Sequence, residues 1–176
     1  YAVRFGAGTI VDRCISTGNG SGTAVHGFEG PAFGGDRTGA VVTSCSSNDN
    51  LASGFRLEGG GVIDGCLAES NGGAGVQTGS GCATNIAALE NVTDGIAASF
   101  TALVSKSVAT GSSRGVFTTG DGAVVSDCLT SGNTDGYVTT GTSVLRGNVS
   151  AGATIRAFDF GARGLAEGNA TLATSI

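Results

Sequence analysis

The sequence has no methionine and no tryptophan, a single proline, a single histidine and a single lysine, and only 13% of its residues are charged. Its nine lysine and arginine residues are scattered, with little aromatic interleaving, which argues against a nucleic-acid partner. No stretch is long and apolar enough to cross a membrane. With one histidine and no C-x-x-C motif, we expect no zinc site and no resident cofactor.

The same scarcities bear on where the protein works. No signal peptide is present and methionine is missing, so we expect the chain to be a mature or excised product. Serine, threonine, glycine and asparagine are abundant while lysine is almost absent, a composition that favours an exported protein. We therefore predict an extracellular or cell-surface location.

What the chain does contain is a repeat. The stretch 59–76 reads GGGVIDGCLAESNGGAGV, and close variants of it occupy 39–55 and 122–137. The positions equivalent to Cys66, which we call anchors, are Cys14, Cys45, Cys66, Ile86, Ser107, Cys128, Asn148 and Asn169. Six of the seven gaps between anchors are 20 or 21 residues and the first is 31, and such a fixed period indicates a repeat architecture.

Short apolar runs precede each anchor. The residues four and three positions before it are apolar in all eight repeats, and the runs are bounded by glycine, asparagine and serine. This pattern predicts short strands rather than helices, and the 33 glycines among 176 residues also disfavour helix interiors. We expect each repeat to form one turn of a coil, with each strand paired to its equivalent about 4.8 Å along the axis.

Two further columns mark the corners of this coil. An asparagine column should form a ladder of stacked side chains that bond one another and the turn backbone, with left-handed backbone tolerated there. Its members are Asn19, Asn50, Asn71, Asn91 and Asn133, with Ser112 in the gap. A glycine column is expected to supply positive φ at another corner. Its members are Gly54, Gly75, Gly95, Gly115 and Gly136.

The resulting pattern, V-[VI]-x-x-C-x-x-x-x-N-x-x-x-G-[VIF], resembles the right-handed parallel β-helix repeat proteins of the pectate-lyase-like superfamily. The resemblance covers nearly all 176 residues. It implies an all-β fold, a single-stranded right-handed parallel β-helix of about eight rungs of 20–21 residues, in one domain over 1–176. It implies no particular activity, because the superfamily includes lyases, hydrolases, epimerases, phage tailspikes and non-catalytic surface proteins.

Four of the five cysteines, Cys14, Cys45, Cys66 and Cys128, share the anchor column. We interpret them as small buried hydrophobic residues with inert thiols. Cys45 and Cys66 should lie one rung apart, so a disulfide between them is allowed but not required.

The one irregularity of the repeat is a predicted loop insertion at about 25–39. It holds the only histidine, the only proline, Phe28 and Phe33. A loop at one rung of a solenoid is a frequent place for function, whereas the alternative is that the two phenylalanines fold back over a groove or an end.

Candidate catalytic residues are few. Asp94, Arg114 and Asp135 precede the corner glycine of successive rungs, so they should form a vertical row. The row is either a surface ladder of alternating charge or an acid, base and cation cluster acting on sugar. Residues 133–136 resemble the N-T-D-G motif of polygalacturonases, but the D-D pair, the G-H-G and the R-x-K of that family are missing. Calcium, which a lyase would need, finds too few clustered carboxylates in the sequence.

No amphipathic helix or charged segment is visible that could cap either end of the coil. The chain stops within one residue of the phase at which it begins, which would suit head-to-tail stacking, although removal of flanking segments explains it equally well. The interface candidates are Tyr1, Val3, Phe5, Leu172 and Ile176. Our leading hypothesis is a non-catalytic extracellular structural solenoid whose partners are copies of itself, end to end. The rivals are a polysaccharide lyase or glycoside hydrolase, and a carbohydrate-binding or tailspike-like module.

Overall fold

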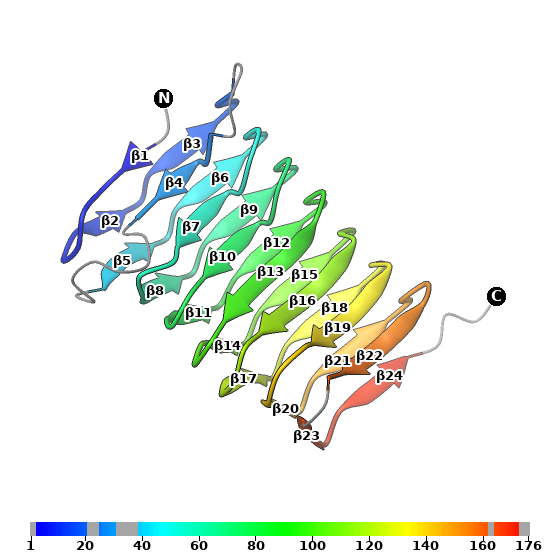
Figure 1. Cartoon of the computed structure of the whole chain (residues 1–176). Coiled ribbons are helices and arrows are strands. Elements are labelled where there is room, and N and C mark those ends of the chain that lie inside the picture. The colour runs from blue at the N-terminus through cyan, green and yellow to red at the C-terminus, as the bar shows by residue number, and fades with distance from the viewer. Residues whose placement is uncertain (1–2, 21–24, 31–38, 162–163, 173–176) are drawn as a thin grey trace.

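The computed structural model describes residues 3–20, 25–30, 39–161 and 164–172, and every regular element within these ranges is a short β-strand. The strands wind into three parallel sheets of eight strands each, which we call A, B and C (Figure 1). The chain visits the sheets in a fixed order, one strand in each per turn. The all-β parallel solenoid is therefore confirmed, with a rung count close to the predicted eight.

Sheet A contains β1 (Val3–Arg4), β4 (Phe28–Glu29), β7 (Phe55–Leu57), β10 (Val76–Thr78), β13 (Asp94–Ser99), β16 (Arg114–Thr119), β19 (Asp135–Thr139) and β22 (Arg156–Phe160). Sheet B contains β2 (Ile10–Asp12), β5 (Ala40–Thr43), β8 (Gly61–Asp64), β11 (Cys82–Thr84), β14 (Leu103–Ser105), β17 (Ala123–Ser126), β20 (Ser143–Arg146) and β23 (Gly164–Glu167). Sheet C contains β3 (Ile15–Thr17), β6 (Ser46–Asn48), β9 (Leu67–Glu69), β12 (Ala87–Leu89), β15 (Val108–Thr110), β18 (Leu129–Ser131), β21 (Val149–Ala151) and β24 (Ala170–Leu172).

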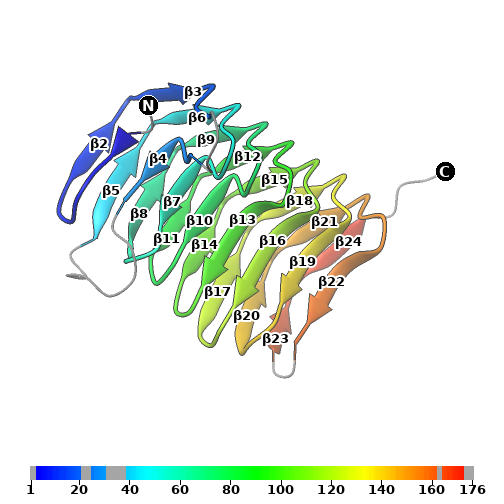
Figure 2. The same cartoon turned by 45° about the horizontal axis from the view of Figure 1, so that its top comes forward.

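Equivalent residues of successive rungs lie side by side along the coil. Val62 of β8 pairs in register with Cys82 of β11, which pairs with Leu103 of β14. Figure 1 and Figure 2 show the rungs following one another from β1–β3 at one end to β22–β24 at the other. The anchor period of the sequence is thus the rung period of the coil. The right hand of the coil and its membership of the pectate-lyase-like superfamily remain predictions.

The core is a narrow column of apolar side chains from the inner faces of the three sheets. Sheet A supplies the largest of them, and its aromatic rings stack directly from rung to rung. Phe28 lies 4.9 Å from Phe55 between ring centroids, and Tyr137 lies 4.9 Å from Phe158. Sheet C supplies mostly alanine and serine to the interior, such as the fully buried Ala68 and Ser47, so the core is wide on one side and thin on the other.

Each regular rung turns two corners by the same backbone device, a left-handed residue followed by a residue that points inward. In the second rung Ser44 has φ 52° and precedes the buried Cys45, whereas Asp49 has φ 54° and precedes the buried Asn50. We call these the cysteine corner, between sheets B and C, and the asparagine corner, between sheets C and A. The left-handed residue is therefore the one before each asparagine rather than the asparagine itself.

The predicted role of the glycine column is wrong. Gly54, Gly75, Gly95, Gly115 and Gly136 all lie outside the left-handed region. They are glycine because space is missing, not because φ is positive. A Cβ atom on Gly75 would lie 2.7 Å from the Gly95 carbonyl oxygen and 2.7 Å from Nδ2 of Asn91, both in the next rung. The column lets the backbone of sheet A approach the asparagine corner closely.

Part of the segment 25–39, predicted as a loop insertion, belongs to the coil. Its strand β4 pairs with β1 on one side and β7 on the other, and Phe28 is fully buried in the core. The extra residues of this rung therefore lie on both sides of β4. Phe33 lies outside the described residues.

Candidate interaction surface

The asparagine corner is a ladder of hydrogen bonds running along the coil. Nδ2 of Asn50 donates to Oδ1 of Asn71 at 2.9 Å, and the backbone N–H of Asn50 donates to the same oxygen at 3.2 Å. In the next rung, Nδ2 and the backbone N–H of Asn71 both donate to Oδ1 of Asn91. Nδ2 of Asn71 and Nδ2 of Asn91 each also donate to a carbonyl oxygen of sheet C. The ladder is interrupted at the buried Ser112, whose backbone N–H donates to Oδ1 of Asn133 at 2.8 Å.

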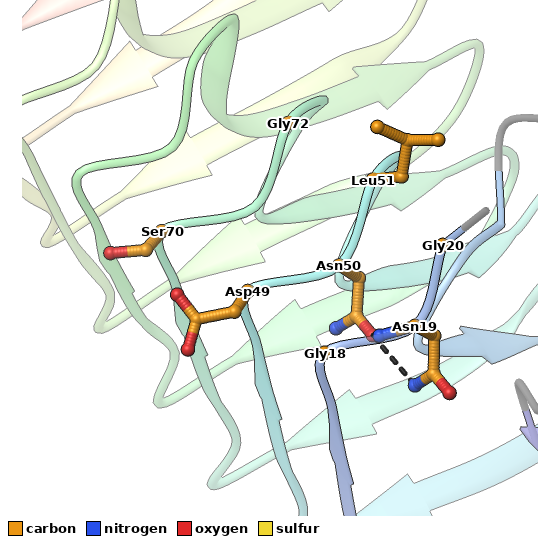
Figure 3. Close-up of a pocket in the computed structure, with 8 residues that line it drawn as sticks. All are labelled: Gly18, Asn19, Gly20, Asp49, Asn50, Leu51, Ser70 and Gly72. Atoms are coloured by element: carbon orange, nitrogen blue, oxygen red, sulfur yellow. Dashed lines mark hydrogen bonds between the residues drawn. The ribbon is translucent and has the colours of Figure 1, made fainter. Parts of the chain in front are cut away.

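A pocket of about 330 Å³ opens beside the first rungs of this corner (Figure 3). Gly18, Gly20 and Gly72 line the pocket without side chains. Asp49, Leu51 and Ser70 also line it. Asn19 and Asn50 also line it, but Nδ2 of Asn19 donates to Oδ1 of Asn50 at 2.7 Å. The amides at the pocket are thus engaged in the ladder.

The cysteine corner is a second ladder, which the sequence interpretation overlooked. The backbone N–H of Cys14 donates to Sγ of Cys45 at 3.4 Å, and that of Cys45 donates to Sγ of Cys66 at 3.4 Å. The cysteine side chains therefore accept hydrogen bonds from the backbone in addition to packing in the core. The signal lay in the anchors that are not cysteine, since three of these four, Ser107, Asn148 and Asn169, carry acceptors, whereas Ile86 does not.

All five cysteines are free thiols in the structure, including Cys45 and Cys66 on adjacent rungs. Burial raises the pKa of the Cys66 and Cys128 thiols to about 11, so both are protonated and unreactive near neutral pH. Cys82 and Cys14 are both partly exposed, but only Cys82 points outward from a strand, on the outer face of sheet B.

Asp94, Arg114 and Asp135 lie in register on sheet A, and Arg156 of β22 extends the row. Arg114 bonds both carboxylate oxygens of Asp94, at 2.5 and 3.0 Å, and Arg156 bonds both oxygens of Asp135, each at 3.0 Å. The Arg156 hydrogen bond holds the pKa of Asp135 below its usual value. Both carboxylates are therefore engaged by arginine. The sequence interpretation omitted Arg156, although it follows Asp135 by one repeat.

A shallow depression of about 310 Å³ lies on the outer face of sheet A, beside this row. The small Ala97 forms its floor, and Gln77 and Phe117 occupy the same column in the neighbouring rungs. The guanidinium of Arg114 lies 3.5 Å from the centroid of the Phe117 ring. The depression combines an aromatic ring with polar groups but holds no unpaired charge from Asp94.

The outer face of sheet B carries an unbroken row of apolar side chains, one from each strand, which we call the sheet B row. Its members are Ile10, Val41, Val62, Cys82, Leu103, Val124, Val144 and Leu165. Ile10 is 73% exposed and Leu165 58% exposed, while most of the others are partly exposed. The signal was present in the sequence, because adjacent residues of a strand point to opposite faces, so one of two neighbouring apolar columns must lie outside.

A similar but interrupted row follows the outer face of sheet C. Ser46 breaks it near one end and Ala87 narrows its middle, while Val108 and Leu129 are 37% and 38% exposed. The sheet B row is thus the longer continuous apolar feature on the described surface.

The first and last rungs leave strand edges without a neighbour in the described part of the chain. Val3 and Phe5 pack partly against the core at one edge, and Phe158 does so at the other. Leu172, in the last strand of sheet C, is 56% exposed. Tyr1 and Ile176, the remaining interface candidates, lie outside the described residues.

Among the residues that the structure describes, no group of three or more histidine, cysteine or acidic side chains is placed to hold a metal ion. The same residues contain no helix long and apolar enough to span a membrane. A comparison of the chain with protein-family models, with curated proteins and with solved structures finds no match.

Proposed function

We propose that this protein is a non-catalytic structural solenoid that stacks end to end, the last rung of one copy pairing with the first rung of the next. The result is a filament or surface fibre, in an extracellular or cell-surface setting. The observation that carries the proposal is the fit between the two terminal edges of sheet A, residue by residue.

At that junction β22 of one copy would continue into β1 of the next, about 4.8 Å away. Extending the sheet A register places Phe158 over Val3, Asp159 over Arg4 and Phe160 over Phe5. The middle pair joins opposite charges. The Arg4 side chain is 81% exposed and lies 3.9 Å from Glu29 of its own copy, and the Asp159 side chain is 34% exposed and pairs with Arg156. The outer pairs join apolar side chains, as the stacked rings do inside the coil.

The other two sheets add apolar and hydrogen-bonding matches. Leu165 would lie over Ile10 in sheet B, and the backbone N–H of Asn169 would meet Sγ of Cys14 in the cysteine corner, repeating the contact of Cys14 with Cys45. One pair is unfavourable, because Glu167 would lie over Asp12. Arg146 and Arg13 bond these two carboxylates within each copy, which offsets their repulsion.

The rival from another class is a polysaccharide lyase or glycoside hydrolase that uses Asp94 and Asp135. Their bidentate bonds to arginine favour the charge ladder over a free acid or base. Polygalacturonate cleavage in the presence of calcium, abolished by Asp135→Asn, would support the enzyme instead.

Electron microscopy and sedimentation of the purified chain test the stacking. We expect filaments of the wild type, loss of filaments in Arg4→Asp and in Asp159→Arg, and their return in the double variant, whose junction has the charges exchanged. Lys106→Asp is the matched control, because it makes the same charge change as Arg4→Asp on an exposed corner in the middle of the coil. Dispersed particles of the wild type under all conditions would refute the proposal.

A further inference from the structure

We propose that two such filaments pair side by side, antiparallel, through the outer face of sheet B. The partner is thus a second copy of this chain, and the inference rests on the end-to-end stacking proposed above. It starts from the sheet B row, which places one apolar side chain on the surface at every rung. Large continuous apolar patches are unusual on the surface of monomeric soluble proteins.

The chemistry of the neighbouring outward column suits a self-complementary contact. This column lies two residues further along each strand of sheet B. Its members are Asp12, Thr43, Asp64, Thr84, Ser105, Ser126, Arg146 and Glu167. Four of the eight are hydroxyl side chains, which can pair with either a charge or another hydroxyl. The face is therefore an apolar stripe beside a polar stripe in which hydroxyl and charged side chains are equal in number.

Symmetry decides the orientation of the pair. When both stripes take part in the contact, a two-fold axis along the coil sets the apolar stripe of one copy against the polar stripe of the other. A two-fold axis along the strand direction sets apolar against apolar and polar against polar, and it makes the two coils antiparallel. Because a two-fold contact uses the same surface on both partners, only the second arrangement buries the sheet B row on both sides while both stripes stay in the contact.

Charge complementarity selects the register. Counting rungs along sheet B, the charged members of the polar column lie on rungs 1, 3, 7 and 8. Setting Arg146 of rung 7 opposite the partner's rung 8 pairs it with Glu167, and it places Asp12 and Asp64 opposite hydroxyl side chains. Registers that pair Arg146 with Asp12 or with Asp64 instead bring two identical carboxylates face to face. In the favoured register Val62 and Cys82 lie opposite each other.

The size of the contact explains why it needs the filament. Eight strands span about 34 Å along the axis and each strand spans about 13 Å, so one chain contributes about 450 Å². Two chains would bury about 900 Å², below the roughly 1,200 Å² of a stable interface. Stacked copies repeat the same contact many times, and this multivalency holds the pair together. In the favoured register rungs 1–6 and rungs 7–8 meet two different copies, so the junctions of the two filaments are staggered.

A pair of matched double variants tests the surface by electron microscopy. We expect the wild type to form paired filaments and Val62→Lys with Val124→Lys, in the sheet B row, to form single filaments. The control is Val108→Lys with Leu129→Lys, which places the same charges in the interrupted row of sheet C and should leave the pairs intact. Single wild-type filaments would overturn the pairing alone. Paired filaments of the sheet B variant would also overturn it, and the absence of any filament would overturn both proposals.

Cross-linking tests the register without disturbing the apolar row. Ile10 and Val124 lie opposite each other in the favoured register but five rungs apart within one chain. Under mild oxidation the double variant Ile10→Cys with Val124→Cys should therefore give disulfide-linked dimers, at least tenfold more than Val41→Cys with Val124→Cys, because only facing residues of the two copies bring these thiols within disulfide distance. In the control, Val41 lies opposite Leu103, so neither introduced thiol has a facing partner. Equal cross-linking of the two variants, or none in either, would overturn the inferred register.

Discussion

The two corners of each rung solve one problem with different side chains. Both follow a left-handed residue, and at both an inward side chain accepts the backbone N–H of the preceding rung. At the asparagine corner, Asn71 makes four hydrogen bonds of 2.9 to 3.2 Å. At the cysteine corner, Cys66 accepts one N–H at 3.4 Å and its single proton can reach one of two carbonyl oxygens. The comparison indicates that both corners use a side-chain acceptor, with Ile86 as the exception at the cysteine corner, and that the amide adds further bonds.

The cysteine corner also uses asparagine in part of the coil. In the last rungs the cysteine corner contains Asn148 and Asn169, and these form the same amide ladder found at the other corner.

The largest expected effect comes from the asparagine corner. Asn71→Ala should lower the free energy of unfolding by about 3 kcal/mol, because the buried backbone N–H of Asn50 loses its acceptor, at about 1–3 kcal/mol, and the bonds of the Asn71 amide to Ser47 and Asn91 are lost as well. Nδ2 of Asn50 loses one acceptor but keeps Oγ of Ser47. Urea unfolding followed by circular dichroism measures it. Asn48→Ala, on the outer face of the same corner, is the control and should change stability little. A loss below about 1 kcal/mol for Asn71→Ala would mean that the ladder is not what stabilises the corner.

The next effect tests the glycine column. Gly75→Ala should cost about 2 kcal/mol, since its Cβ would press on the Gly95 carbonyl and the Asn91 amide, and overpacking typically costs 1–3 kcal/mol. Thermal unfolding of the variant measures the loss. The control is Gly6→Ala, where a Cβ meets nothing within 4 Å. Equal melting temperatures for the two variants would contradict the close approach.

A smaller effect is expected when an anchor cysteine is replaced by asparagine, the side chain of the other corner. Cys66→Asn should change stability by less than about 1 kcal/mol, because the amide keeps the acceptor for Cys45 and can donate to the Val42 carbonyl, as Asn148 does to Val125. Urea unfolding beside Asn71→Ala gives the comparison directly. If both variants lose the same amount, the cysteine corner depends on its thiol in a way that the hydrogen bonds do not explain.

The smallest effect leaves stability untouched and compares the two faces of the coil. A thiol whose pKa is raised stays protonated until the pH approaches that pKa, so Cys66 and Cys128, at about 11, should resist alkylation at pH 8. Cys82 should react first, because it lies outside. Mass spectrometry after iodoacetamide treatment distinguishes the sites, and treatment in urea should label all five. Early labelling of Cys66 in the native protein would show that the corner opens.

Much of the fold could be predicted from residue spacing. The 20- or 21-residue gaps between anchors such as Cys66 and Ile86 determine which residues pair, since a parallel coil repeats its register at every turn. The spacing could not reveal why Gly75 is glycine, because the atoms that crowd it come from the next rung. Nor did it identify the Arg156 contact with Asp135 as bidentate, which depends on how the two side chains point.

The sequence by itself determined the period, the strand positions and the asparagine column at one corner, because these follow from local backbone preferences and the alternation of side chains. Only the tertiary structure decided which apolar column is core and which is surface, and what each anchor bonds. Those properties depend on atoms about 20 residues apart in the chain and one rung apart in space, and they exist only once the coil has closed.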